Sequence, residues 1–195
     1  MLGGRNARVQ SLRKDGRHAR ADRTRAAIVG ALLDLADRGL LAPTAQQIAD
    51  AAGVALRSIR QHFETRESLL LAAAQEYAHR AGPRPAPVER TLPLEARIVA
   101  FARARSSELE SSAPLRRAAQ LAEDGSPAVH KAMAATRHAR RREIATLFED
   151  VLGASPDADA LLDAVDLLAG GVVYDTLGRD KRARLERMLR LVLRG

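Results

Sequence analysis

The chain has 195 residues, of which 46% are hydrophobic, so it can bury one large core or two small ones. It has no cysteine, which excludes disulfides, thiolate metal sites and cysteine nucleophiles, and it has no apolar run near the roughly 20 residues that span a bilayer. Its net charge is +8, and most of the excess lies in residues 1–25, where seven Arg, one Lys and two Asp give +6.

Residues 1–22 form a basic arm without apolar periodicity. Such arms are usually disordered alone and attracted to polyanions, so we expect a flexible segment that can lie along a minor groove of DNA. The alternative is a solvated tail without a binding role. No apolar core follows the basic residues, so the start does not resemble a secretory signal. We therefore expect a cytoplasmic protein with no membrane partner.

Every later periodic segment predicts a helix, and none alternates as a strand would, so we predict an all-α protein with about nine helices. Four of the eight prolines fall within residues 81–95, which indicates a linker. The predicted helices are Arg23–Arg38, Ala45–Ala52, Leu56–His62, Arg66–Arg80, Leu94–Ser111, Pro114–Glu123, Pro127–Leu152, Pro156–Leu177 and Asp180–Leu193.

The second and third predicted helices have the features of a helix-turn-helix. Thr44 and Gln47 fit a capping box, and Gly53 can make the turn between the helices. On the third helix Ile59 is an apolar anchor, and five other side chains can donate hydrogen bonds to DNA: Arg57, Ser58, Arg60, Gln61 and His62. The alternative, a small helical subdomain with an ordinary polar surface, does not explain so many donors on one short helix.

The segment PTAQQIADAAGVALRSIRQHFETRESLLLAA resembles the DNA-binding signature of the TetR (tetracycline-repressor) family of bacterial transcriptional regulators. The matching residues are Thr44, Ile48, Ala49, Ala51, Ala52, Gly53, Val54, Ile59, His62, Phe63, Glu67, Leu69 and Leu70. The resemblance implies an all-α homodimer with an N-terminal three-helix DNA-binding domain, here residues 23–66. It also implies a C-terminal helical domain for ligand binding and dimerisation, here residues 67–195, which resembles the family only in length and helical content.

The resemblance also implies roles for individual residues. Thr44 would contact a phosphate at the start of the second helix, and His62 and Arg66 would contact the DNA backbone near the fourth. Leu56, Arg57 and Gln61 occupy positions that read bases or line the groove.

Three residues depart from the family pattern. Ala55 stands where a Ser or Thr usually caps the recognition helix, and loss of such a cap costs about 0.5–2 kcal/mol. Arg57 stands where a small residue is common. Arg60 replaces a tyrosine whose hydroxyl meets a phosphate. Because Arg60 can bind phosphate with a full charge, we expect that the affinity for DNA is retained, that it depends more steeply on salt, and that the operator sequence differs. The alternative is a DNA-binding domain that binds DNA poorly.

Two apolar stripes near the C-terminus predict a homodimer interface built from the last two helices. The first contains Leu161, Val165, Leu168 and Val172, and the second contains Leu185, Met188, Leu189 and Val192. Gly170 and Gly171 interrupt the first stripe and suggest a close helix contact. The alternative is that these stripes belong to the core of a single chain.

Polar residues on otherwise apolar stripes suggest where a ligand binds. Arg105 and Arg137 are such residues, and a buried arginine needs a partner. An internal acid such as Glu108 or Glu123 is favoured over a ligand anion. Helix phase predicts a pocket lined by Tyr77, Phe101, Arg105, Met133, Arg137 and Val172.

Motifs of catalysis are missing from the sequence, which has no Gly-rich phosphate loop, no GxSxG and no HExxH, and whose five histidines are scattered. We predict no enzyme activity, no catalytic residue, no metal and no cofactor. The predicted function is a sequence-specific transcriptional regulator, a homodimeric repressor that binds a double-stranded DNA operator and is released by a small-molecule effector. The alternative is a non-specific or architectural DNA-binding protein without a ligand.

Overall fold

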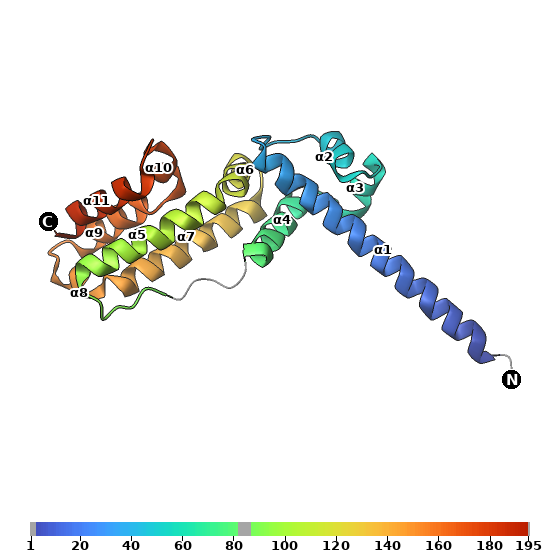
Figure 1. The fold of residues 1–195 in the computed structure, drawn as a ribbon, viewed down its shortest axis with the longest axis horizontal. Coiled ribbons are helices and arrows are strands. Elements are labelled where there is room, and N and C mark those ends of the chain that lie inside the picture. Colours follow the sequence, from blue (N-terminus) through green and yellow to red (C-terminus); the bar gives the residue numbers. More distant parts are fainter. Residues whose placement is uncertain (1–2, 82–86, 195) are drawn as a thin grey trace. The chain divides into compact units, whose positions relative to one another are not determined.

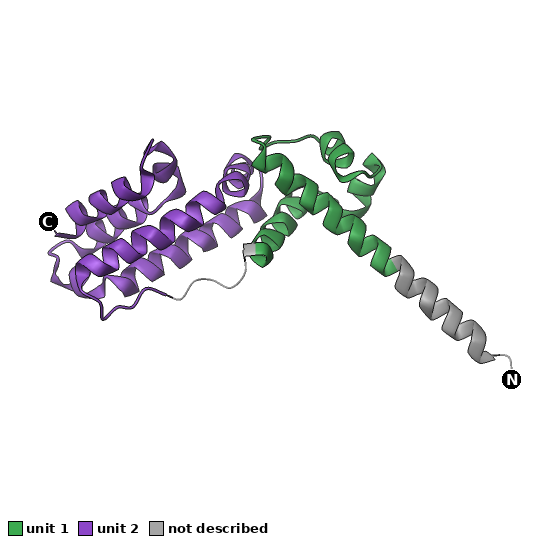
Figure 2. Cartoon of the chain, in the orientation of Figure 1, with its two compact units in different colours: residues 1–80 green, residues 81–195 purple. Residues whose placement is uncertain are grey.

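The structure, a computed structural model, describes the backbone of residues 3–81 and 87–194, and the side chains of residues 18–80 and 87–194. Within these residues it contains eleven α-helices and no strand (Figure 1), so the all-α prediction is confirmed. The chain divides into two compact units, residues 1–80 and residues 81–195 (Figure 2). No helix in the described part is both long and apolar enough to cross a membrane.

The first unit contains four helices. They are α1 (Gly3–Asp37), α2 (Ala45–Ala52), α3 (Leu56–His62) and α4 (Arg66–Ala81). The unit therefore includes α4, which the sequence analysis grouped with the second domain. Both α2 and α3 have the predicted bounds.

The predicted start of the first helix, Arg23, is wrong, because α1 already begins at Gly3. Residues 3–22 contain no proline and are rich in Arg and Ala, so a helix nucleated further along can extend through them. The arm that we expected to be flexible is thus helical in its backbone from Gly3. The side chains of residues 1–17 lie outside the described residues.

All four helices contribute to the core of the first unit. Two helices as short as α2 and α3 are marginal alone, so they depend on α1 and α4 for an apolar surface. The core includes Ile28, Leu32 and Ala36 of α1, Ile48 and Ala49 of α2, Ile59 of α3, Phe63, and Leu69, Leu70 and Ala73 of α4.

Local signals set the bounds of α2. The backbone N–H of Thr44 donates to Gln47 Oε1 at 2.8 Å, and the N–H of Gln47 donates to Thr44 Oγ1 at 3.2 Å, which completes the predicted capping box. Gly53 ends the helix with φ +64°, a left-handed conformation that favours glycine.

The second unit contains seven helices, six of which contribute to one large apolar core. They are α5 (Leu94–Ser111), α6 (Ala113–Glu123), α7 (Pro127–Leu147), α8 (Glu149–Ala154), α9 (Ala158–Leu168), α10 (Gly171–Thr176) and α11 (Lys181–Arg194). The largest fully buried side chains of this unit are Tyr174, Phe148, Ile98, Leu109, Ile144, Leu185, Leu189 and Val165.

Two predicted helices are broken, which raises the number from about nine to eleven in the described residues. The helix predicted at Pro127–Leu152 breaks at Phe148, whose ring packs edge to face against Phe101 with ring centroids 5.8 Å apart. The helix predicted at Pro156–Leu177 breaks at Ala169 and Gly170, between α9 and α10. Side chains from α5 bind backbone oxygens beside both breaks, and helical periodicity cannot reveal such contacts.

Much of the two apolar stripes assigned to the dimer interface lies in the core of the second unit. Val165, Leu168, Leu185 and Leu189 are all buried within the single chain. The intramolecular alternative therefore holds for these four residues. Three large apolar side chains of α9, α10 and α11 remain on the surface: Leu167 at 65% exposure, Val172 at 67% and Leu191 at 76%.

Candidate nucleic-acid interface and polar network

The third helix has one buried face and one open face. Ile59 is 6% exposed and packs into the core of the first unit, and Phe63, directly after the helix, is also buried. Arg57, Arg60 and Gln61 are exposed. Among the other predicted DNA contacts, Leu56 is at 36% exposure, and Ser58 and His62 are half-buried. Of the five predicted donors of α3, the structure therefore exposes Arg57, Arg60 and Gln61, and the other two only in part.

The start of α3 lacks a side-chain cap. Ala55 occupies the N-cap position with extended backbone angles, and no side chain accepts a hydrogen bond from the first turn. The missing cap at Ala55 is one of the three expected departures from the family pattern. The orphan N–H groups of the first turn are therefore left without a capping side chain.

Thr44 is exposed at the start of α2, but its hydroxyl is already engaged. Thr44 Oγ1 accepts from the Gln47 N–H and donates to Gln47 Oε1 at 3.1 Å. A hydroxyl has a single proton to donate, so a phosphate can take that proton only by replacing the amide of Gln47. The predicted phosphate contact of Thr44 would therefore exchange one acceptor for another.

Arg66, at the start of α4, has a structural partner that sequence reasoning missed. Its Nη1 donates to the carbonyl oxygen of Pro43 at 3.1 Å. Pro43 is buried and directly precedes Thr44, so this bond connects the first turn of α4 to the start of α2. A guanidinium has five N–H donors, and one such bond leaves others available to a phosphate.

Arg25 of α1 makes a second contact that the sequence did not predict. Its guanidinium carbon lies 4.5 Å from the centre of the Phe63 ring, within cation–π distance. A cation is thereby held beside the C-terminal end of α3. The pairing joins residues far apart in the sequence, and no local pattern indicates it.

The predicted ligand residues lie in different settings. Phe101 is 2% exposed in the core, and Val172 lies on the surface. Met133 is half-buried on α7, whereas Tyr77 belongs to the first unit. The role of these residues in binding an effector stays a prediction.

The two predicted ligand arginines have acidic partners inside the chain. Arg105 Nη1 donates to Glu108 Oε2 at 2.6 Å, and Arg105 Nε donates to the carbonyl oxygen of Ala169 at 2.7 Å. Burial lowers the pKa of Arg105, opposed by the nearby Glu108. Arg137 Nη1 lies 2.7 Å from Glu123 Oε1. The favoured alternative, an internal acid, therefore describes both arginines in this structure.

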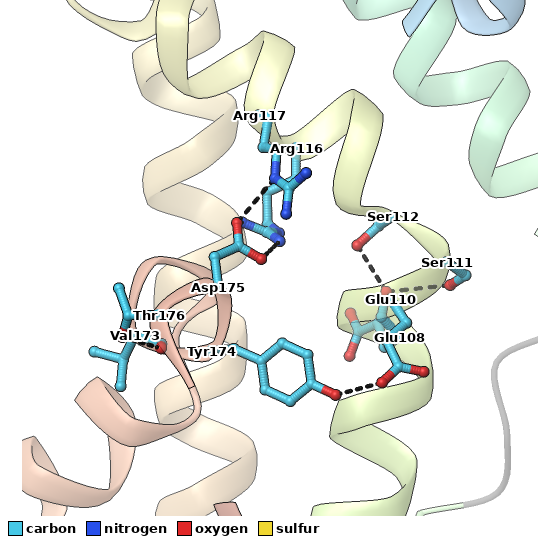
Figure 3. A network of polar contacts seen from close by, with 10 residues as sticks. All are labelled: Glu108, Glu110, Ser111, Ser112, Arg116, Arg117, Val173, Tyr174, Asp175 and Thr176. Atoms are coloured by element: carbon cyan, nitrogen blue, oxygen red, sulfur yellow. Dashed lines mark hydrogen bonds and ion pairs between the residues drawn. The ribbon is translucent and has the colours of Figure 1, made fainter. Parts of the chain in front are cut away.

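A polar network joins α10 to α5 and α6 (Figure 3). The two terminal nitrogens of Arg116 donate to the carboxylate of Asp175 at 2.9 and 3.1 Å, and Arg117 Nε donates to the same group at 3.0 Å. The Tyr174 hydroxyl donates to Glu110 Oε1 at 2.6 Å. Burial opposes the ionised form of Asp175, but hydrogen bonds from Arg117 and Arg116 outweigh it and lower its pKa to about 2.

Gly171 lies directly against this network. A Cβ atom placed there would come within 2.5 Å of Arg116 Nη1, so a side chain at this position requires the guanidinium to move. We expected the glycine pair to mark a close helix contact, but the neighbour of Gly171 is an arginine side chain. In the described residues no group of three or more His, Cys, Asp or Glu side chains is arranged to hold a metal ion.

Comparisons with known proteins agree with the helix-turn-helix. Residues 28–73 match the family model of bacterial regulatory proteins of the tetR family. A solved structure titled as a transcriptional regulator from Rhodococcus sp. Rha1 has a similar fold, with a TM-score of 0.64 and 19% sequence identity. That likeness covers 87% of this chain and 93% of the other. No curated protein matches the chain.

Proposed function

We propose that this chain, whose N-terminal unit carries the DNA-binding domain of the TetR family, is a homodimeric transcriptional repressor released from its operator by a small-molecule effector. The observation that carries the proposal is the two-faced helix α3. Ile59 and Phe63 hold it against the core, and Arg57, Arg60 and Gln61 extend from its open face. In a helix-turn-helix this helix enters the major groove, where such side chains meet bases and phosphates.

Dimerisation through the last helices is part of the proposal. The support is three large apolar side chains that α9, α10 and α11 leave exposed: Leu167, Val172 and Leu191. In a homodimer, two DNA-binding domains related by a two-fold axis must match half-sites about 34–36 Å apart, or a multiple of that distance. An effector would lower operator affinity if it binds more tightly to a conformation in which the two DNA-binding domains have a different spacing.

The proposal is tested by fluorescence anisotropy with the purified full-length chain. The probe is the intergenic DNA upstream of its own gene, compared with a shuffled duplex at two salt concentrations and with excess competitor DNA. A sequence-specific regulator keeps its preference for the upstream DNA at the higher salt. If the protein prefers neither duplex at the higher salt concentration, a selection from random sequences shows whether it prefers any sequence.

An architectural DNA-binding protein gives the opposite outcome in these experiments. It binds both duplexes equally, loses both as salt rises, and enriches no sequence from the random pool, because phosphate contacts carry its affinity. The basic segment at residues 1–25 is the feature that favours this second candidate.

A further inference from the structure

The buried face of α3 fixes where its exposed side chains point. Successive residues of an α-helix are about 100° apart around the axis. With Ile59 facing the core, Arg57 and Gln61 each lie about 160° from it, on either side of the outward direction and about 40° apart. They are therefore the two side chains of α3 that point most directly away from the protein.

The other polar residues of α3 point sideways. Arg60 and Ser58 lie about 100° from Ile59, on opposite flanks of the helix, and His62 lies nearer the core and is half-buried. When a helix lies in the major groove, its outward face meets the base edges and its flanks meet the phosphate walls. Arg60 is therefore suited to phosphate, and Arg57 and Gln61 are suited to bases.

Both outward side chains are available for recognition. Arg57 and Gln61 are exposed, and within the described residues neither side chain takes part in a hydrogen bond, ion pair or ring contact. Arg57 also lies in the first turn of α3, the part of a recognition helix that contacts base edges in helix-turn-helix proteins. Their donors and acceptors thus need not break any internal bond to reach DNA.

We propose that Arg57 reads a guanine and Gln61 reads an adenine, one or two base pairs apart, in each operator half-site. The proposal rests on the proposed regulator function and deepens it by naming the operator class. Arginine forks onto guanine O6 and N7, and glutamine pairs with adenine N6 and N7. The two residues are four apart, about 6 Å along the helix, which corresponds to about two base-pair steps of roughly 3.4 Å.

The test is a selection from random duplexes with the full-length protein, run in parallel for wild type, Arg57→Ala, Gln61→Ala and the flank control Arg60→Ala. Wild type should enrich half-sites with a G·C and an A·T pair at the stated spacing. Gln61→Ala should lose the adenine preference and keep the guanine, and Arg57→Ala should do the reverse. The lost preference should be roughly 5- to 150-fold, which corresponds to about 1–3 kcal/mol for a bidentate pair. Arg60→Ala should bind more weakly with the same preferred sequence.

A redirecting variant keeps the test informative if an alanine variant folds poorly. Gln61→Glu should shift the preferred base from adenine to cytosine at the same position, because a carboxylate accepts from cytosine N4. The inference is overturned if wild type selects a site without this G and A pair, or if the Gln61 variants leave the adenine unchanged. If wild type enriches no sequence at all, the proposed regulator function fails as well, so the two failures are distinguishable.

Discussion

Arg66 Nη1 donates a hydrogen bond to the carbonyl oxygen of Pro43 at 3.1 Å, and so connects the start of α4 to the residue before the capping box of α2. The two helix starts that the family resemblance assigns to the DNA backbone are therefore joined directly. A change at Arg66 can act on DNA binding both through a lost phosphate contact and through a displaced α2.

We expect Arg66→Ala to show both effects. Loss of the bond to Pro43 should lower the free energy of unfolding by about 1 kcal/mol, which a lower melting temperature would reveal. Loss of one phosphate contact should reduce the slope of log affinity against log salt by about 0.9. Arg60→Ala is the control. Because Arg60 is exposed, its substitution should change the salt slope and leave the melting temperature as it is. A lower melting temperature with an unchanged slope would show that Arg66 only positions α2.

Ala55→Ser should stabilise the first unit. Ala55 already has extended N-cap angles, with φ −71° and ψ 146°, so a serine hydroxyl can accept from the first turn of α3 without a change of backbone. The expected gain is about 0.5–2 kcal/mol, measured by thermal or denaturant unfolding. Ala55→Val is the comparison, because valine lacks the hydroxyl and, like alanine, is a poor N-cap residue. Equal stability of the serine and alanine proteins would contradict the prediction.

Gly171→Ala should destabilise the second unit. The new methyl group would displace Arg116 from Asp175, and hydrogen bonds to charged groups contribute about 1.5–3 kcal/mol. Gly153→Ala is the matched control, because a Cβ atom there meets nothing within 4 Å and alanine favours the helix α8. In an Arg116→Ala background the Gly171 substitution should lose most of its effect. Equal costs in both backgrounds would disprove the clash with Arg116.

Asp150 should make a pH-dependent contribution to stability. Hydrogen bonds from Arg97 at 2.6 and 2.7 Å lower its pKa from 3.8 to about 2. A lowered pKa in the folded state means that the contribution is present above pH 3.8 and is lost as the pH falls through about 2. Because the Asp150 side chain is 64% exposed, we expect only about 1 kcal/mol at neutral pH.

The check on Asp150 is urea unfolding of wild type and Asp150→Asn across this pH range. The difference in unfolding free energy should be present at pH 7 and should disappear as the pH falls through 2. Asp163→Asn is the control, because its partner Arg141 is 35% exposed, whereas Arg97, the partner of Asp150, is 5% exposed. A difference that stays constant with pH would mean that the ionisation of Asp150 does not stabilise the fold.

The features that the sequence predicted are those with local signals. The bounds of α2 follow from Thr44, Gln47 and Gly53, all within ten residues of one another. The acidic partner of Arg105, Glu108, lies three residues along the same helix and was among the acids considered. Such short-range pairs can be inferred from spacing alone.

The features that the sequence missed depend on residues far apart in the chain. Arg97 binds the carbonyl oxygen of Leu147 beside the break at Phe148, and Arg105 binds Ala169 beside the break between α9 and α10. An apolar stripe cannot reveal whether it faces its own chain or a second copy, which is why the interface prediction included core residues such as Leu185. The remaining site predictions concern DNA and an effector, and they await the binding experiments.

The hydrogen bond from Tyr174 to Glu110 also gives the protein an optical reporter. The chain has no tryptophan and two tyrosines, so its near-ultraviolet signal comes chiefly from two phenols. Burial and the bond to Glu110 raise the pKa of Tyr174, which delays its conversion to tyrosinate in an alkaline titration. The absorbance of that late-titrating phenol therefore reports on the junction of α5 and α10 without any attached dye.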